Sequence, residues 1–148
     1  MSGFLLDTNA ISAFAPARAE PSPAFAAWLD EQERANNIFL SAVTVHELEK
    51  GIRMLMHRGA TAKAEGLRIW LLGLTTVYAD NILPLDAVVT KISGELEATA
   101  VSAGYNPGAT NAMIAGTAKA NGLTVITNNL KDFVPFSVAA KSPAQLVG

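Results

Sequence analysis

The 148-residue chain contains no cysteine, so disulfide bonds, thiolate metal ligands and cysteine nucleophiles are all excluded. It has only two histidines, His46 and His57, and they lack a partner spacing suited to zinc. No serine stands in a turn typical of a nucleophile. The glycine- and proline-containing segment at residues 104–108 lacks the Gly-Lys-Ser/Thr ending of a phosphate-binding loop. These absences leave the acidic and amide side chains as the main candidates for chemistry.

Charge is scarce as well, since charged residues make up 16% of the chain and the net charge is −2. Soluble domains usually carry about a quarter, so a partner is expected to cover part of the apolar surface. Without strong basicity, the composition neither supports nor excludes a nucleic-acid substrate. No apolar run approaches the roughly 18 residues that span a bilayer, and no targeting segment is visible. We expect a cytoplasmic protein without membrane association.

Short apolar runs alternate with helical patterns along the whole chain. Strands are expected at residues 3–6, 38–40, 82–85 and 123–126, with a last short one near 136–139. Helices are expected at residues 23–33, 41–59, 61–78, 86–103 and 109–120. Parallel strands need crossovers, which are usually helical. The pattern therefore predicts one three-layer α/β/α domain over residues 1–148, with a short-stranded parallel sheet of four or five strands.

Four polar residues occupy the places where such a sheet gathers its function, at the carboxyl ends of strands. Asp7 ends the first strand, and Glu47 lies in the first turns of the helix after the second. Asn111 is near the start of the helix that leads into the fourth strand, and Asp132 lies just after that strand. Each alone is also explained as a helix cap, a solvated helix residue or a turn residue. Together they are expected to face one crevice.

Three carboxylates at close range repel one another and favour a bound cation. Oxygen-only ligands suit Mg²⁺ or Mn²⁺ better than Zn²⁺. A metal held in this way can lower the pKa of a bound water and stabilise charge on a phosphate. Asp7, Glu47 and Asp132 therefore predict a metal site suited to hydrolysing phosphodiesters.

Four segments resemble, in order, the sequence blocks of PIN domains, and together they extend over essentially the whole chain. These segments are residues 4–9 (FLLDTN), 41–51 (SAVTVHELEKG), 110–118 (TNAMIAGTA) and 123–133 (LTVITNNLKDF). In the second block a glutamate precedes a glycine by four residues, and the fourth is a strand followed by an acidic turn. Within the family, the chain is most similar to the VapC-like and FitB-like toxins of bacterial toxin–antitoxin pairs.

The resemblance implies a Mg²⁺- or Mn²⁺-dependent endoribonuclease that cleaves RNA, forms a homodimer and is inhibited by a small antitoxin protein. It implies that Asp7, Glu47 and Asp132 are metal ligands, and that they form the catalytic site together with position 111. Supporting polar residues that orient this site are implied at the following positions: Asn9, Thr127 and Asn129.

Two positions depart from the family pattern. Asn111 stands where the family has aspartate, and Asn128 stands where a basic residue is common. An amide offers a neutral oxygen but no negative charge, so weaker metal binding is expected. A degenerate natural homologue and a deliberate inactivating change both explain Asn111.

Three other functions stay open at this stage. The first is a catalytically degenerate PIN fold that only binds RNA or an antitoxin. The second is a phosphatase or another metal-dependent hydrolase that uses the same acids. The third is a receiver domain, in which Lys131 would imitate the lysine after a late strand, although the order of the blocks fits the PIN family better.

Overall fold

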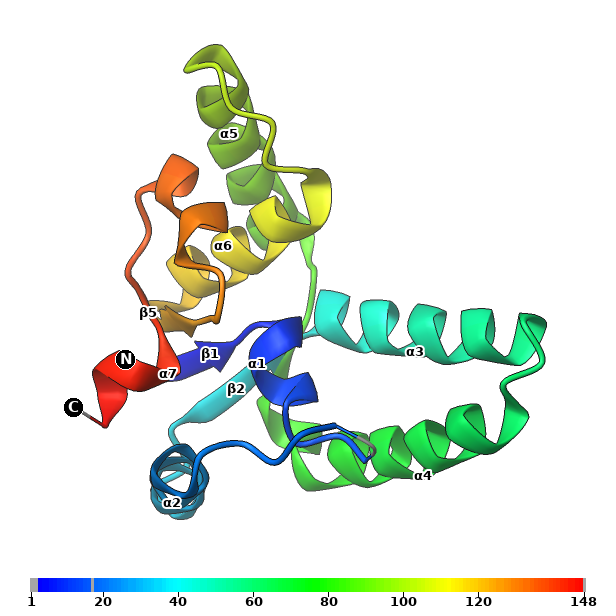
Figure 1. Cartoon of the computed structure of the whole chain (residues 1–148). Helices are drawn as coiled ribbons and strands as arrows, with labels where there is room; N and C mark the ends of the chain where they lie inside the picture. Colours follow the sequence, from blue (N-terminus) through cyan, green and yellow to red (C-terminus); the bar gives the residue numbers. More distant parts are fainter. Residues whose placement is uncertain (1–2, 17, 148) are drawn as a thin grey trace.

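A five-stranded parallel sheet forms the centre of the molecule (Figure 1). The computed structural model describes residues 3–16 and 18–147. The strands are β1 (Phe4–Leu6), β2 (Ile38–Ser41), β3 (Ile82–Leu83), β4 (Thr124–Ile126) and β5 (Ala140–Lys141). Their order is β3-β2-β1-β4-β5, and every neighbouring pair is parallel. The predicted parallel sheet is confirmed, with the larger of the two strand numbers.

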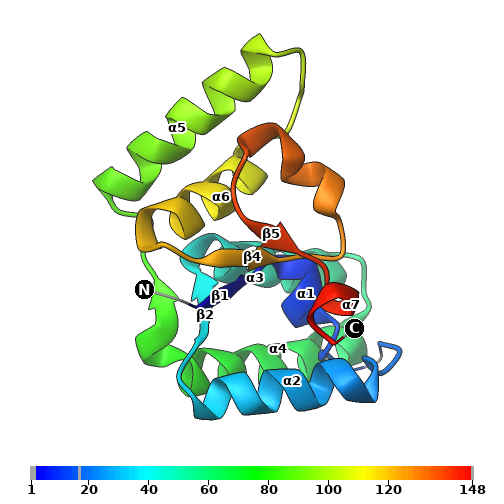
Figure 2. The ribbon, with the colours of Figure 1, turned by 90° about the vertical axis from the view of Figure 1, so that its left-hand side faces the viewer.

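Helices cover both faces of the sheet, as Figure 2 shows with α5 and α6 on one side and α2 and α4 on the other. The α-helices are α1 (Thr8–Ser12), α2 (Pro23–Arg34), α3 (Ala42–His57), α4 (Thr61–Val77), α5 (Ala87–Ser102), α6 (Ala109–Asn121) and α7 (Pro143–Leu146). Short 3-10 helices lie at η1 (Ala79–Asn81), η2 (Leu130–Asp132) and η3 (Val134–Phe136). The predicted three-layer α/β/α fold is confirmed.

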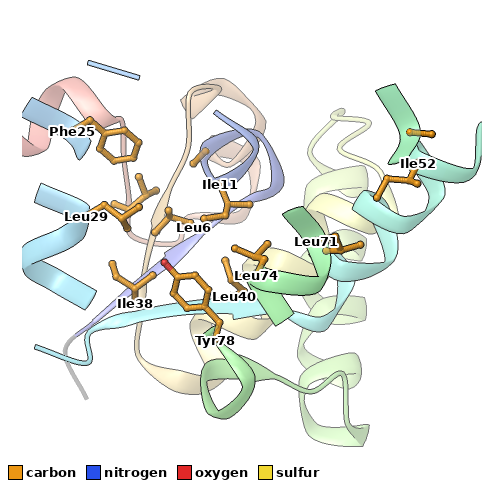
Figure 3. Close-up of a cluster of buried hydrophobic side chains, with 13 residues drawn as sticks. Leu6, Ile11, Phe25, Leu29, Ile38, Leu40, Ile52, Leu71, Leu74 and Tyr78 are labelled. Atoms are coloured by element: carbon orange, nitrogen blue, oxygen red, sulfur yellow. The ribbon is translucent and has the colours of Figure 1, made fainter. Parts of the chain in front are cut away.

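The central strands β1, β2 and β4 are mostly apolar because each face of the sheet has its own core. Leu6 points into a cluster with Leu40 and Ile126 under α1, α2 and α4 (Figure 3). Its neighbour Leu5 points to the opposite side and packs with Val125 in the cluster under α6. Successive side chains in a strand alternate between faces, so a sheet covered on both sides favours apolar residues at successive positions.

The helix starts follow the local chemistry that the sequence indicates. The hydroxyl of Ser22 accepts a hydrogen bond from the Phe25 N–H at 3.1 Å, and Pro23 occupies the first turn of α2. The hydroxyl of Ser41 caps α3, and the carboxylate of Asp86 caps α5. Side-chain oxygens at these positions accept from backbone N–H groups that have no partner within the helix.

The expected strand at residues 136–139 is wrong. The strand in this region is β5, at Ala140–Lys141. It starts later because η3 extends to Phe136 and Ser137 follows with a left-handed φ of 53°. A 3-10 turn followed by a left-handed residue breaks the extended backbone that a strand needs.

Two smaller differences concern β3 and the end of the chain. The expected strand at residues 82–85 ends at Leu83, because Pro84 has no N–H to donate to a ladder. The short helix α7 was not predicted; Ser142 and Gln145 form a capping box at its start. No helix in the described ranges is long and apolar enough to cross a membrane.

Candidate functional site

The strand order places a crevice beside the carboxyl end of β1. The chain runs from β1 outward to β2 and β3, and then crosses to β4 on the other side of β1. The connections at β1 and β4 therefore leave the sheet in opposite directions, and ligands of open α/β sheets bind at such a switch point. Asp7 directly follows β1, and Thr127 directly follows β4.

Asp7 is fixed as the N-cap of α1, where its Oδ1 accepts a hydrogen bond from the Ala10 N–H at 3.0 Å. The residue is only 4% exposed. Burial, and to a smaller extent the negative charges of Glu47 and Asp132, raise the pKa of Asp7 to about 6. The hydrogen bonds from Thr127 and Ala10 act in the opposite direction. Asp7 is thus a buried carboxylate whose charge is opposed by two neighbouring carboxylates.

Glu47 is held in place by Thr8, the first residue of α1. The hydroxyl of Thr8 donates to Oε1 of Glu47 at 2.5 Å and lies 3.2 Å from the hydroxyl of Thr44, also on α3. Thr44 is fully buried, and Glu47 is half-buried. Thr8 therefore fixes the carboxylate of α3 beside the strand that carries Asp7. Apart from the position of Thr8 directly after Asp7, no pattern in the sequence predicts this contact.

The expected supporting residues form one network between α1 and the end of β4. The fully buried hydroxyl of Thr127 accepts from Nδ2 of Asn9 at 3.4 Å and from the N–H of Asn129 at 3.0 Å. Oδ1 of Asn9 in turn accepts from the N–H of Asn128 at 2.9 Å. These bonds fix the loop after β4 against the helix after β1. That Asn9, Thr127 and Asn129 orient the acidic residues stays a prediction, and these hydrogen bonds are consistent with it.

Asn111 lies in the first turn of α6 and uses its amide group within its own segment. Its Nδ2 donates to the carbonyl oxygen of Pro107 at 3.2 Å. An aspartate in the same orientation could not make this bond, because a carboxylate has no proton to donate. The carbonyl of Pro107 therefore favours the asparagine that is present.

One pocket of about 360 Å³ collects the four predicted catalytic positions. Its lining includes Asp7, Glu47, Asn111 and Asp132, together with Asn9 and Asn129. Asn128 instead lines a separate depression formed with α2 and α7. Asn128, which stands where PIN domains commonly have a basic residue, thus lies outside this pocket.

Sequence reasoning missed three polar residues of the same pocket, namely Thr8, Ser12 and Arg18. Among the described residues that line it, Arg18 is the only basic one. Arg18 belongs to a proline-containing loop whose path over the surface is set by packing. No periodicity or spacing in the sequence could have placed it here.

The donor set of the pocket suits a hard divalent cation. Its carboxylates, amides and hydroxyls offer oxygen ligands, which Mg²⁺ and Mn²⁺ prefer. In residues 3–16 and 18–147, no three His, Cys, Asp or Glu side chains are grouped closely enough to enclose an ion. Mg²⁺ commonly keeps several waters and binds through one or two carboxylates. The chemistry of the donors therefore fits such an ion. Its positive charge would offset the repulsion between the carboxylate of Asp7 and those of Glu47 and Asp132.

Comparisons with known proteins identify the family of the chain. The PIN domain family matches residues 4–136. The chain is 36% identical over 140 residues to toxin FitB of Neisseria gonorrhoeae, covering 94% of this chain and 96% of that protein. It is 35% identical over 136 residues to VapC ribonuclease Y4jK of Sinorhizobium fredii, covering 91% of each.

Solved structures give the same result. The crystal structure of FitAcB from Neisseria gonorrhoeae matches with a TM-score of 0.80 at 34% identity, over 95% of this chain and 98% of the other. DNA-bound VapBC from Salmonella typhimurium matches with a TM-score of 0.79 over 97% and 99%, and at 22% identity it supports the fold alone. With its sheet order, its pocket and these matches, the chain belongs to the PIN-domain family.

Proposed function

We propose that this protein is a metal-dependent endoribonuclease of the toxin–antitoxin type. The observation that carries the proposal is the single pocket at the switch point, where Asp7, Glu47 and Asp132 meet Asn111. The relatives named as toxin FitB and as a VapC ribonuclease support RNA as the substrate. Mg²⁺ or Mn²⁺ would be held by carboxylates from the set Asp7, Glu47 and Asp132, with waters as its remaining ligands.

The ion, when bound, would supply positive charge to a scissile phosphate and lower the pKa of a bound water. The protein contributes fixed positions for its own acids. The Ala10 N–H holds Asp7, and the Thr8 hydroxyl holds Glu47. Positions that are fixed before the reaction need no reorganisation during it, which is how enzymes gain most from electrostatic groups.

Asn111 makes the site less acidic than a pocket with four carboxylates. Its amide oxygen can still accept a hydrogen bond or contact an ion, but it adds no negative charge. We expect weaker metal binding and slower water activation than in an otherwise identical protein with aspartate. Under this proposal, the chain with Asn111 has an attenuated ribonuclease activity.

Cleavage of RNA in Mg²⁺ or Mn²⁺ tests this function directly. The wild type is compared with Asn111→Asp, which we expect to be faster, and with Asp7→Asn, which we expect to be inactive. Metal loading is measured separately by calorimetry. The proposal fails if neither wild type nor Asn111→Asp cuts any RNA while both are folded and hold the metal.

A second candidate is a PIN fold that binds RNA or an antitoxin without cutting. The observation in its favour is the hydrogen bond from Asn111 to Pro107, which suits the asparagine. Tight binding of a partner, with no cleavage in any metal even in Asn111→Asp, would select this function. Activity on small phosphate esters but not on RNA would instead select a phosphatase.

We also propose two protein partners, a cognate antitoxin and a second copy of this chain. FitAcB and VapBC are among the similar structures, and VapBC-5 from Mycobacterium tuberculosis is a member of the VapBC family of toxin–antitoxin systems. A small protein encoded next to this gene should bind the chain and suppress cleavage. Light scattering on the purified protein should give twice the chain mass of 15.5 kDa; the monomer mass would contradict a homodimer.

A further inference from the structure

We propose that Thr44 and Thr8 set the metal preference of the acidic pocket, because they fix Glu47 with one carboxylate oxygen free and so favour Mg²⁺ over Ca²⁺. Thr44 is a positioning residue that acts through Thr8. The ion rests on the proposed metal-dependent function, whereas the contacts among the three side chains are defined by the described residues.

The three side chains come from two helices that the fold brings together. The hydroxyl of Thr8, the first residue of α1, donates to Oε1 of Glu47 at 2.5 Å and lies 3.2 Å from Oγ1 of Thr44. Thr44 and Glu47 are three positions apart on α3 and therefore lie on one face of that helix. The helix α1 lies against α3 (Figure 1). We call these three hydrogen-bonded side chains the hydroxyl relay.

The direction of the relay follows from the number of protons. A threonine hydroxyl has one proton to donate, and a carboxylate only accepts. The proton of Thr8 is used by Glu47, so Thr8 accepts in its contact with Thr44, and Thr44 is the donor. Hydrogen bonds in such a series polarise one another, and a bond to a charged acceptor is stronger than a neutral one. Thr44 therefore strengthens the hold of Thr8 on Glu47.

The burial of Thr44 indicates that its hydroxyl serves this purpose. The residue is 0% exposed, and a buried hydroxyl destabilises the fold unless it is hydrogen-bonded. Five other helical threonines donate to the backbone carbonyl four residues earlier, namely Thr75, Thr76, Thr90, Thr99 and Thr117. Within residues 3–16 and 18–147, the side chain of Thr44 bonds only to Thr8. Valine would fill the same space, so packing alone does not require a hydroxyl here.

The relay leaves Glu47 with one oxygen available to a ligand. Thr8 occupies Oε1 and fixes the plane of the carboxylate, while Oε2 accepts no hydrogen bond from any residue that the structure describes. Glu47 and Thr8 line the acidic pocket, and Thr44 does not. Mg²⁺ demands a near-ideal octahedron and is bound through few carboxylates, whereas Ca²⁺ takes more oxygens in flexible sites and often uses both oxygens of a carboxylate. A fixed carboxylate with a single free oxygen therefore favours Mg²⁺.

Metal binding in the absence of RNA tests the relay. Free Mn²⁺ is measured by electron paramagnetic resonance, and Mg²⁺ and Ca²⁺ are added as competitors to obtain the dissociation constant of each. Thr8→Val removes the donor to Glu47 and should weaken Mg²⁺ binding about tenfold or more. Ca²⁺ binding should weaken less, so the preference for Mg²⁺ over Ca²⁺ should fall. Thr44→Val should lower that preference in the same direction by a smaller factor, because Thr8 can still donate.

Conservative variants and a matched control separate positioning from packing. Thr8→Ser and Thr44→Ser keep the hydroxyls and should retain most of the metal preference. Thr117→Val is the control, because Thr117 is also fully buried and its hydroxyl donates to the carbonyl of Met113 at 2.7 Å, away from the pocket lining. It should lower the melting temperature without changing the preference. Thr8 is only half-buried, so Thr8→Val tests the relay without opening the core.

The inference is overturned if Thr8→Val and Thr44→Val keep the wild-type preference, or if Thr117→Val lowers it equally. RNA cleavage by the wild type would then leave the ribonuclease standing without the relay. If the preference falls as expected while no variant cleaves RNA, the relay stands as part of a metal site and the ribonuclease fails. A wild type that binds none of the three ions would overturn both the relay and the metal dependence.

Discussion

The carboxylate of Asp7 stabilises α1 as its cap and is at the same time a buried charge next to two others. Burial and the neighbouring carboxylates raise its pKa from 3.8 to about 6. Between these values the folded protein binds more protons than the unfolded chain. Its contribution to stability therefore falls as pH rises from about 4 to about 6, and the loss is complete above that.

Asp7→Asn should stabilise the metal-free protein at neutral pH, by up to about 3 kcal/mol, because it removes this charge and keeps an oxygen for the Ala10 N–H. Urea unfolding in EDTA at several pH values checks it. The difference between variant and wild type should grow from pH 4 to pH 6 and be constant above pH 7. A variant that is less stable than wild type at every pH would contradict a buried charge at Asp7.

Asn111→Asp should have opposite effects with and without metal. Without metal it loses the hydrogen bond to Pro107 and adds a fourth carboxylate, so the free energy of unfolding should drop by about 1 kcal/mol. With Mn²⁺, the added charge should raise metal affinity above that of wild type. Calorimetric titration and thermal melts check the two effects, and equal Mn²⁺ affinity in both proteins would remove Asn111 as the cause of attenuation.

At the scale of elements, α5 and α6 approach each other closely at one glycine. A Cβ built on Gly116 of α6 would lie 2.0 Å from Oγ and 3.0 Å from Cα of Ser93 on α5. Ser93 is buried and its hydroxyl donates to the carbonyl of Val89 at 2.8 Å, so it has no room to move away. The small residue at position 116 is what lets the two helices pack.

Gly116→Ala should therefore destabilise the protein by about 1–3 kcal/mol, the usual effect of overpacking. Gly94→Ala on α5 is the control, because a Cβ there meets nothing within 4 Å. That substitution should be neutral or should stabilise by up to about 1 kcal/mol, as alanine is the better helix former. Chemical denaturation compares the stabilities of the two variants. Equal stability would contradict the close contact, because it would mean that α5 and α6 can move apart at no cost in free energy.

For the whole molecule, metal binding should appear as added stability, because an ion that binds only the folded chain shifts the unfolding equilibrium. At 100 times its dissociation constant the gain is about 2.7 kcal/mol, which for a chain of this size corresponds to a rise in Tm of about 5–10 °C. Thermal melts with and without Mn²⁺ measure it. Asp7→Asn is the control and should show a much smaller rise; an equal rise in both would place the ion elsewhere.

Local chemistry made most elements predictable from the sequence. Ser22, Ser41 and Asp86 have side chains that cap helices, and each stands where a helix begins. The prediction failed near residues 136–139, because the left-handed turn at Ser137 is not encoded by a glycine or proline. Apolar residues alone do not distinguish a short strand from a turn packed on the core.

The sequence by itself determined the parallel α/β fold and the polar residues that end its strands, because alternating apolar runs and helices leave few other arrangements. It placed Asp7, Glu47, Asn111 and Asp132 at the correct ends of their elements. Only the tertiary structure decided that one pocket collects them, that Thr8 holds Glu47, and that Arg18 reaches the pocket from its loop. Contacts between residues far apart in the chain depend on how the layers of the fold pack. A local sequence pattern contains no information on the spatial distance between such residues.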